Sequence, residues 1–408
     1  MRDTANRRSK RLLKGRSKRQ SDVVDYIICM AVLIQSALII FQHILMGIFG
    51  IDPEGTTIYR VVLTAVPMII AIILAFIRRP SLFLIVYIIA SAILLLHTLV
   101  FPANAEFIMK DGLRFLLPVV IPSALCLITV RDIGIVERSA VIISWATVFM
   151  VFIYAFAFFR GLFLIESYSM GFSYGCLLPM LVLYTRRKVF PVIVSFLVFL
   201  VVVSIGSRGA AAVFVVFVAI DIFLSRSRLR WVAVAAGVLF VLLLPAFSSI
   251  VDSLGINSRV LNLINAGDIG HTSGREGIYG AVIAAMKGHL LLGLGLFGDR
   301  VFLEGAYCHN LLLEIFVDFG LFFGTMIILF GILALFICYR ASRNRYRTMW
   351  LVFALSGILP FLASSSYLIY NPLAILIGYS VLVYNRVQHK GAASLVFKKS
   401  RPRREVSI

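Results

Sequence analysis

Arg208, Arg275 and His309 are residues of this chain whose types suit chemistry on a phosphate ester. An arginine guanidinium stays charged and its planar fork binds two phosphate oxygens, while a histidine can take a proton near neutral pH. Each of the three borders a long apolar run, and Arg208 stands within the stretch GSRGA. A charge in such surroundings needs a reason, and these residue types offer anion binding combined with proton transfer.

The stretch HTSGREGIYGAVIAAMKGH predicts a helix over residues 274–287. Ser273 and Glu276 fit a capping box, apolar residues follow at helical spacing, and Gly288 can end the helix. Arg275 then lies in the first turn, where free backbone N–H groups and the helix dipole already favour an anion. The pattern indicates a phosphate or diphosphate site, although many surface helices also begin with a charged residue.

The stretch HNLLLEIFVDFGLFFG begins at His309 and opens a long apolar helix. His309 and Asn310 are expected at the outer membrane surface, where a histidine can either cap the helix or act as a base. Glu314 and Asp318 are four residues apart and share a helix face. Acids this close to a membrane are costly unless they face protein or water, so we expect both to form ion pairs with arginines.

Two further patterns argue against nucleotide and metal chemistry. The stretch GLGLFG, residues 293–298, matches a dinucleotide fingerprint in letters only, because no strand precedes it; it predicts a flexible glycine turn near the membrane surface. The spacing of His271, His289 and His309 matches no compact metal-ligand motif, and the five cysteines show no CxxC spacing. We therefore expect no cofactor, no metal site and no disulfide framework.

The elements that must hold these residues are membrane helices. The chain has 408 residues, of which 61% are hydrophobic and 14% charged, whereas a soluble domain carries about a quarter charged residues. Blocks of about 20 apolar residues recur, which is the length at which a helix crosses a bilayer. The sequence predicts an all-α integral membrane protein with about twelve transmembrane helices, over 26–48, 58–77, 81–101, 113–130, 139–159, 168–185, 189–205, 210–224, 231–250, 311–338, 348–365 and 367–385.

Lysine and arginine set the expected orientation. Every predicted inner loop is basic, so both termini are expected in the cytoplasm. The basic tails then serve as topology signals that touch the anionic lipid bilayer, and no nucleic acid is expected as a partner. The predicted order is a basic tail (1–25), transmembrane helices 1–9 (26–250), an external loop with an amphipathic helix (251–308), helices 10–12 (309–385) and a second basic tail (386–408).

A minority of basic residues fall on the predicted outer side, against the positive-inside bias. Arg208 lies there in a very short turn between predicted helices seven and eight. Snorkelling at a helix end is a sufficient reason for Arg60 and Arg160. The complete outer set is Arg60, Lys110, Arg114, Arg160, Arg208, Arg259, Arg275, Lys287 and Arg300.

Taken together, three ordered motifs resemble the O-antigen ligase and polymerase superfamily of bacterial membrane glycosyltransferases (the Wzy/WaaL type). They are GSRGA opening a span, then GREGIYGAVIAAMKGHLLLGLGLFG, then HNLLLEIFVDFGLFFG, and they cover about residues 204–324. Two departures are visible, because Tyr279 stands where a tryptophan is often found and Asp318 where glutamate is usual. Neither departure removes a charge.

The resemblance implies transfer of a glycan from a polyprenyl-diphosphate carrier to an acceptor glycan, on the outer face of the bacterial cytoplasmic membrane and without metal or nucleotide. Arg208 and Arg275 match the arginines thought to hold the diphosphate, and His309 matches the proposed base, so these three are the catalytic candidates. The expected reaction is one direct displacement with inversion. Substrate-binding candidates are Arg208, Arg275, Asn310, Arg160 and Tyr279.

Three functions stay open at this point. A polymerase of O-antigen, capsule or exopolysaccharide extends one lipid-linked chain with another, and it is the favoured hypothesis. A ligase would move the finished glycan to lipid A core, protein or wall. A membrane transporter is the alternative of another class, and it would be expected to show internal repeats and charged or broken helices near the midplane.

Overall fold

The computed structural model describes residues 20–163, 170–224, 229–253, 258, 260–262, 275–342 and 344–399. Within these residues the regular elements are helices and there is no strand, as the apolar blocks predict. Helices suit a chain in lipid because each satisfies its own backbone N–H and C=O groups.

A first helix covers Gln20–Leu33. The elements that follow are α2 (Gln35–Gly47), α3 (Pro53–Arg78), α4 (Pro80–Val100), η1 (Pro102–Asn104), α5 (Ala105–Phe107), the π-helix η2 (Ile108–Val120), α6 (Ile121–Thr129), α7 (Ile133–Phe159), α8 (Met170–Thr185), α9 (Val189–Ile205), α10 (Arg208–Leu224), α11 (Leu229–Ser253), α13 (Arg275–Met286), α14 (Gly298–Phe302), α15 (Leu311–Ala341), α16 (Asn344–Ala363) and α17 (Pro372–Lys399).

Five of these helical segments are long and apolar enough to cross a membrane: Ile58–Arg78, Pro80–Val100, Pro102–Thr129, Ile133–Phe159 and Leu311–Ala341. A sixth span results if the first helix and α2, which meet at a bend of 48°, are counted as one. Each remaining predicted span overlaps a helix that does not meet this criterion of length and apolar composition. The all-α membrane class is therefore supported, while the number twelve and the orientation stay predictions.

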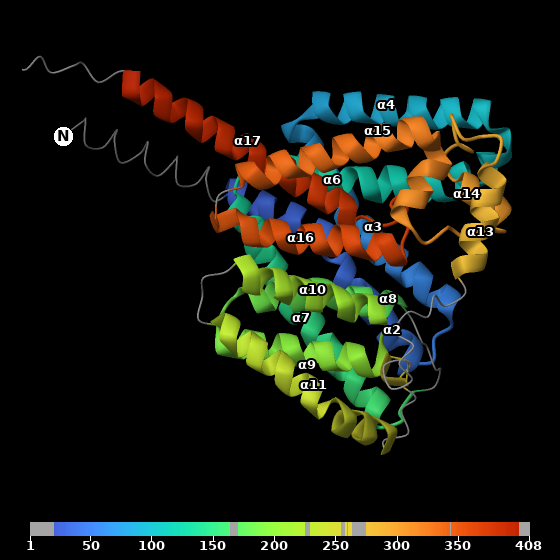
Figure 1. The fold of residues 1–408 in the computed structure, drawn as a ribbon. Coiled ribbons are helices and arrows are strands. Elements are labelled where there is room, and N and C mark those ends of the chain that lie inside the picture. The colour runs from blue at the N-terminus through green and yellow to red at the C-terminus, as the bar shows by residue number, and fades with distance from the viewer. Residues whose placement is uncertain are drawn as a thin grey trace, which may run out of the picture.

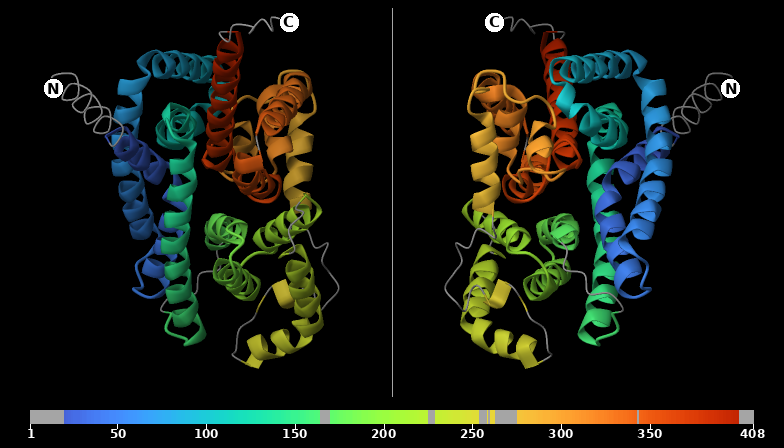
Figure 2. Two further views of the ribbon diagram at one scale, coloured as in Figure 1. Left: turned by 90° about the vertical axis from the view of Figure 1, so that its left-hand side faces the viewer. Right: turned by 90° about the vertical axis from the view of Figure 1, so that its right-hand side faces the viewer.

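The helices form one bundle with α8 near its centre, in contact with α2, α7, α9, α10 and α16. In Figure 2, α2, α3 and α7 lie together along one side of this bundle. Figure 1 shows that α17 runs away from α13 and α14 toward the end at which the first helix begins. The residues selected for chemistry therefore gather at the opposite end from the described chain ends.

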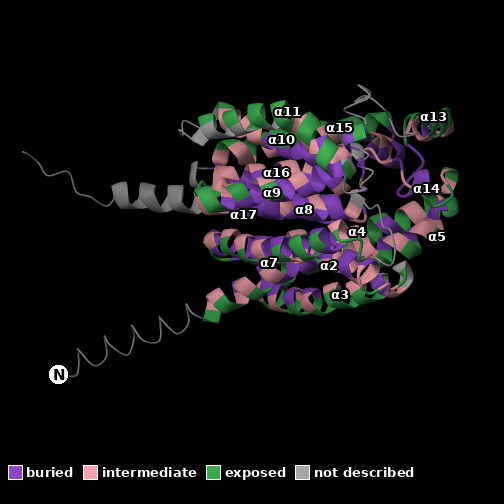
Figure 3. Cartoon of the chain, turned by 90° about the horizontal axis from the view of Figure 1, so that it is seen from below, coloured by how far each residue is buried: buried purple, intermediate pink, exposed green. Residues whose placement is uncertain are grey.

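The outer helices present apolar side chains to their surroundings. Ile69 on α3, Leu96 on α4 and Phe330 on α15 are each more than half exposed. Side chains on the central helices α8 and α9 are mostly buried, as Figure 3 shows. An apolar surface of this extent is typical of contact with lipid.

Helix α15 is broken at Gly320, whose φ of 73° and ψ of 174° are open only to glycine. Residues 290–294, which lead into the glycine turn, fill the break, because Leu294 N donates to Val317 O at 2.6 Å and Leu321 N donates to Leu290 O at 2.7 Å. The structure therefore has a packed turn over residues 293–298, where a flexible one was expected. Residues 293–298 are buried and the segment that leads into them is hydrogen-bonded to α15, since a broken helix in an apolar region must find new partners for its backbone.

The last predicted span is also shorter than expected at its start. Prediction placed it over 367–385, whereas residues 364–371 are non-helical and α17 begins only at Pro372. Asn371 stands before this proline, and a residue in that position is disfavoured in a helix. This non-helical segment, residues 364–371, is the connection between α16 and α17 and is called here the 364–371 segment.

Candidate active site

Ser364 contacts two of the residues selected from the sequence, Arg275 and His309. Its Oγ lies 3.1 Å from Arg275 Nη2, which donates to it, and it accepts a second hydrogen bond of 3.0 Å from Tyr174 Oη. Its carbonyl oxygen lies 3.1 Å from His309 Nδ1 and 3.3 Å from Tyr307 Oη. These five residues, Tyr174, Arg275, Tyr307, His309 and Ser364, are called the Ser364 cluster.

The contact with Ser364 sets the protonation of His309. A carbonyl oxygen only accepts, so Nδ1 carries the hydrogen and the lone pair of the neutral ring stays on Nε2. Burial lowers the pKa of His309; the bond to the Ser364 carbonyl opposes this effect and the charge of Arg275 adds to it. The imidazole is therefore neutral near pH 7, which is the state of a general base.

The local backbone explains how His309 reaches this position. Asn310 is the N-cap of α15, and its Oδ1 accepts from Leu312 N at 3.0 Å and Leu313 N at 3.2 Å. His309 precedes the cap with a φ of 55°, in the left-handed region that a side chain other than glycine rarely adopts. Its ring is held by Ser364 and by Tyr307, whose ring centroid lies 4.2 Å away.

The start of α13 follows the prediction closely. The helix begins at Arg275 and ends at Met286, within one residue of each expected boundary, and Gly288 follows with a φ of 97°. Arg275 lies in the first turn and is half-buried. The proposed cap Ser273 and the candidate ligand His271 lie outside the described residues.

The small residues of GSRGA allow a close approach to α8. Ser207 N donates to Ser173 Oγ at 2.7 Å, and a Cβ added to Gly209 would lie 2.5 Å from Tyr174 Oη. Arg208 is half-buried at the first position of α10, between these two contacts. The start of α10 therefore packs against Tyr174 of the Ser364 cluster.

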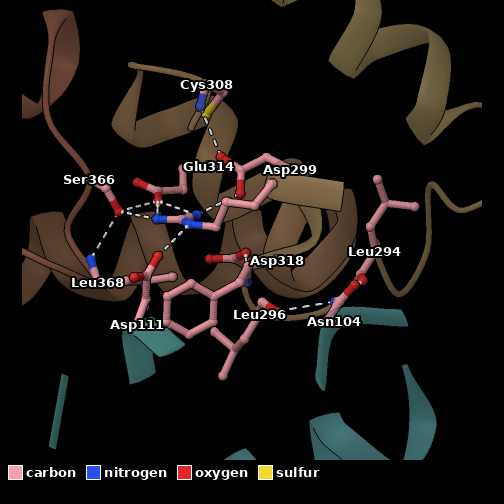
Figure 4. Close-up of polar contacts among 12 residues, drawn as sticks. Asn104, Asp111, Leu294, Leu296, Asp299, Cys308, Glu314, Asp318, Ser366 and Leu368 are labelled. Atoms are coloured by element: carbon pink, nitrogen blue, oxygen red, sulfur yellow. Dashed lines mark hydrogen bonds and ion pairs between the residues drawn. The ribbon is translucent and has the colours of Figure 1, made fainter. Parts of the chain in front are cut away.

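A second cluster surrounds Arg300, which sequence reasoning named only as one of the outer basic residues. Its guanidinium is fully buried and contacts Asp299 at 2.6 Å, Glu314 at 3.3 Å and Asp111 at 3.6 Å. Nη2 also donates to Ser366 Oγ at 2.8 Å, and Figure 4 shows this arrangement. Burial alone would lower the pKa of Arg300, but the neighbouring carboxylates raise it, so the side chain stays charged.

The two acids of the stretch HNLLLEIFVDFGLFFG, Glu314 and Asp318, differ in their partners. Glu314 forms an ion pair with Arg300 and also accepts from Ser366. Asp318 accepts from Phe297 N at 3.2 Å and from Tyr367 Oη at 2.5 Å. Among the residues that the structure describes, no arginine or lysine lies within ion-pair distance of Asp318, so its expected ion pair is replaced by these hydrogen bonds.

The Arg300 cluster fixes the two parts of the chain that carry His309 and Ser364. It is made up of Asp111, Asp299, Arg300, Glu314, Asp318, Ser366 and Tyr367. Ser366 and Tyr367 fix the 364–371 segment that carries the Ser364 carbonyl. Cys308 N donates to Asp299 Oδ2 at 2.9 Å and fixes the residue before His309. Arg300 therefore helps to position the residues around His309 without contacting its ring.

The other two substrate-binding candidates lie apart from these contacts. Arg160 is exposed at the end of α7, with its guanidinium 5.6 Å from the centroid of the Phe156 ring. Tyr279 is half-buried on α13, one turn after Arg275. Neither has a described contact with the Ser364 cluster, and their role in binding stays a prediction.

A cavity of about 490 Å³ adjoins the Ser364 cluster. Tyr174, Tyr307 and Ser364 form part of its wall, and the rest comes from the first helix and from α2, α3, α8, α16, the 364–371 segment and α17. In the part of the chain that is described, no group of three or more His, Cys, Asp or Glu residues is arranged to hold a metal ion. The reacting groups therefore lie beside a space large enough for a small ligand.

Sequence reasoning missed the residues that connect the site. Ser364 and Ser366 lie in a serine run that interrupts the apolar stretch from Leu351 to Tyr384. Asp299 and Arg300 follow directly after the glycine turn. In both places polar residues interrupt an apolar run. In a membrane protein such residues are usually paired with other polar or charged groups.

A comparison with protein families matches residues 193–328 to the model described as O-antigen ligase. No curated protein matches the chain. The matched segment runs from α9 into α15 and contains all three ordered motifs. It therefore includes Arg208, Arg275 and His309 but ends before Ser364.

Proposed function

We propose that this protein is the polymerase of a bacterial surface polysaccharide. The match of residues 193–328 to the family model described as O-antigen ligase supports a place for the chain in the O-antigen ligase/polymerase superfamily. The protein takes glycan from a polyprenyl-diphosphate carrier and passes it to a sugar hydroxyl of an acceptor glycan. The reaction occurs at the Ser364 cluster, on the external face of the cytoplasmic membrane, and uses no metal.

The observation that carries this proposal is the shared contact of Arg275 and His309 with Ser364. It places a fixed cation beside a neutral imidazole whose Nε2 lone pair is free to accept a proton. Transfer from a diphosphate to a hydroxyl needs these two functions. The leaving group already has a low pKa, so charge stabilisation and positioning are the main tasks.

The proposed reaction is a single displacement. Arg275 and Arg208 bind the diphosphate oxygens through their planar guanidinium groups. The acceptor hydroxyl oxygen attacks the anomeric carbon while His309 Nε2 takes its proton. The bond from the anomeric carbon to the phosphate oxygen breaks, and its electron pair leaves with the polyprenyl diphosphate. The anomeric configuration inverts.

The neighbours of His309 support a route without a covalent intermediate. Burial raises the pKa of the adjacent Cys308 thiol, as does the nearby carboxylate of Asp299, so this sulfur is not a thiolate at neutral pH. Burial also raises the pKa of Tyr307, so its hydroxyl remains a hydrogen-bond donor. Histidine is then the group at this place that is suited to move a proton.

A ligase is the second candidate, because the matched family model is itself described as O-antigen ligase. It would use the same cluster and differ only in the acceptor. The gathering of Arg275 and His309 at one end of the bundle, with Arg208 beside them, favours either enzyme over a transporter, whose charged groups would line a path through the membrane.

The test is a product gel. Purified protein in liposomes receives only polyprenyl-diphosphate-linked repeat units, with His309→Ala and Arg275→Ala assayed in parallel. Lys287→Ala is the matched control, since Lys287 is an exposed cation just after the same helix. A ladder of longer lipid-linked glycans that both site variants lose is the expected result. Product that forms only after lipid A core is added would identify a ligase, and a ladder that survives both substitutions would refute the site.

A further inference from the structure

The cavity beside the Ser364 cluster contains a cation that the proposed reaction does not use. Arg60, on α3, lines this cavity together with Tyr307, Ser364 and Tyr370. It is half-buried. Its ionisable neighbours are Tyr370 and Arg114, and His43 lies within range of its charge. Snorkelling explains an arginine that reaches for water, but it does not explain one that lines a ligand-sized cavity.

No acidic side chain offsets this charge within the cavity. Of the described residues that form its wall, none is aspartate or glutamate, and Arg60 is the only arginine or lysine. A cation partly removed from water is costly unless it is paired. The wall therefore has an excess positive charge, and an anionic ligand would remove that cost.

The rest of the wall is suited to a sugar. The wall contains the amide side chains of Gln35, Gln42 and Asn371 and the hydroxyls and ring faces of Tyr174 and Tyr370. Some of these groups already have partners, since Gln42 Nε2 donates to Thr56 Oγ1, Asn371 Nδ2 to Val32 O and Ser123 Oγ, and Tyr174 Oη to Ser364 Oγ. Such groups match the hydroxyls and the C–H surfaces of a pyranose. A volume of about 490 Å³ also falls within the range of about 300–1,000 Å³ typical of small-ligand pockets.

We propose that this cavity is the acceptor subsite and that Arg60 binds the carboxylate of an acidic sugar, such as a hexuronate, in the acceptor glycan. This inference rests on the proposed glycosyl transfer, because it assigns the acceptor to the space next to His309. Arg60 is then a specificity-determining residue. It selects an acidic acceptor over a neutral one, while Arg208 and Arg275 remain available for the diphosphate of the donor.

The inference can be tested by binding alone. Methyl glucuronide has a carboxylate at C6, where methyl glucoside has a hydroxymethyl group. Each sugar is titrated into the full-length protein in detergent, and binding is measured by calorimetry. The wild type is expected to bind the glucuronide about tenfold more tightly or better, since a hydrogen bond to a charged group is stronger than one between neutral groups. Arg60→Gln should lose this preference, and Arg60→Lys should keep part of it.

The matched control is Arg79→Gln, because Arg79 is an exposed arginine at the other end of the same helix. It should keep the full preference. Unfolding temperatures of all variants show whether a loss comes from misfolding, and the Arg60→Lys variant provides a folded comparison. Equal binding of the two sugars, binding of neither, or a preference that survives Arg60→Gln would overturn the inference.

Two further experiments separate this inference from a lipid-phosphate site and from failure of the proposed function. Vesicles that contain polyprenyl diphosphate should not displace the glucuronide; displacement that depends on Arg60 would show a lipid-phosphate site and overturn the inference. The liposome product gel tests the reaction independently. If the protein binds glucuronide through Arg60 but forms neither a ladder nor a ligated product, the assignment of the subsite stands and the proposed function is refuted.

Discussion

The Nδ1 atom of His309 lies 3.1 Å from the carbonyl oxygen of Ser364. This contact decides which ring nitrogen can act as a base, because a backbone carbonyl cannot donate a hydrogen. It also joins two parts of the chain that are 55 positions apart. The orientation of the base therefore depends on the short segment between α16 and α17.

Replacement of His309 by glutamine should abolish transfer without abolishing binding of the donor. Glutamine keeps a polar side chain but cannot accept a proton near neutral pH, and general base catalysis contributes roughly 10²–10⁴-fold. Initial rates of ladder formation should fall by that factor, while binding of the polyprenyl-diphosphate glycan stays within about twofold. His289→Gln, at an exposed position, is the control. A rate within tenfold of wild type would exclude His309 as the base.

The activity should depend on pH through His309. Burial lowers the pKa of His309, and the charge of Arg275 lowers it further. The base is active when it is unprotonated, so the rate should be constant at neutral pH and fall only below the ordinary histidine value of about 6.5. Arg275→Gln removes a positive neighbour and should raise the pKa of His309, which an NMR titration of the imidazole would show as a shift to higher pH without relying on activity. A shift to lower pH, or none, would contradict the assigned geometry.

Arg300 should matter for folding more than for substrate contact. Removal of its guanidinium leaves the carboxylates of Asp299 and Glu314 buried without their cation, which costs about 3–5 kcal/mol. Arg300→Met should therefore lower the unfolding temperature in detergent strongly. Arg300→Lys should rescue only part of the loss, because an ammonium group cannot replace the planar guanidinium that binds several acceptors at once. Arg340→Met, at an exposed cation on α15, should change little; equal effects of the two methionine variants would refute the role of the cluster.

The break in α15 gives a prediction with an internal control. A methyl group at Gly320 meets the backbone of Leu291 and requires a disfavoured φ of 73°, so Gly320→Ala should destabilise the protein by more than about 1 kcal/mol. Gly331 lies on the same helix with no atom within 4 Å of an added Cβ. Gly331→Ala should be neutral or slightly stabilising. Unfolding temperatures compare the two, and equal values would show that the turn tolerates movement.

Sequence patterns predicted the helices well and the polar network poorly. Apolar blocks located the helices because burial in lipid acts over about 20 residues at once. The capping pattern located α13 to within one residue of each end. Three ordered motifs indicated the family, and they all fall within the matched segment.

The contacts between these parts were not predictable in the same way. Nothing near His309 in the sequence indicates that Ser364 will hold its ring, since the partner lies on a distant segment. Glu314 was expected to meet an arginine, yet the sequence did not say which one. Asp318 found a tyrosine and a backbone N–H instead of a cation, because one helical turn carries it past Arg300 to the glycine turn. Pairing over long separations is decided by packing, which a local pattern does not contain.

The cavity wall has a consequence for how such enzymes diverge. Of the described residues that line it, Tyr307 alone falls within the matched segment, residues 193–328; the others come from helices before and after it and from the 364–371 segment. Under the proposed function, the catalytic candidates lie in the matched segment, whereas most of the proposed acceptor subsite lies outside it. Substitutions in α2, α3 or α16 are then expected to change which glycan is accepted without altering the groups proposed to bind the diphosphate.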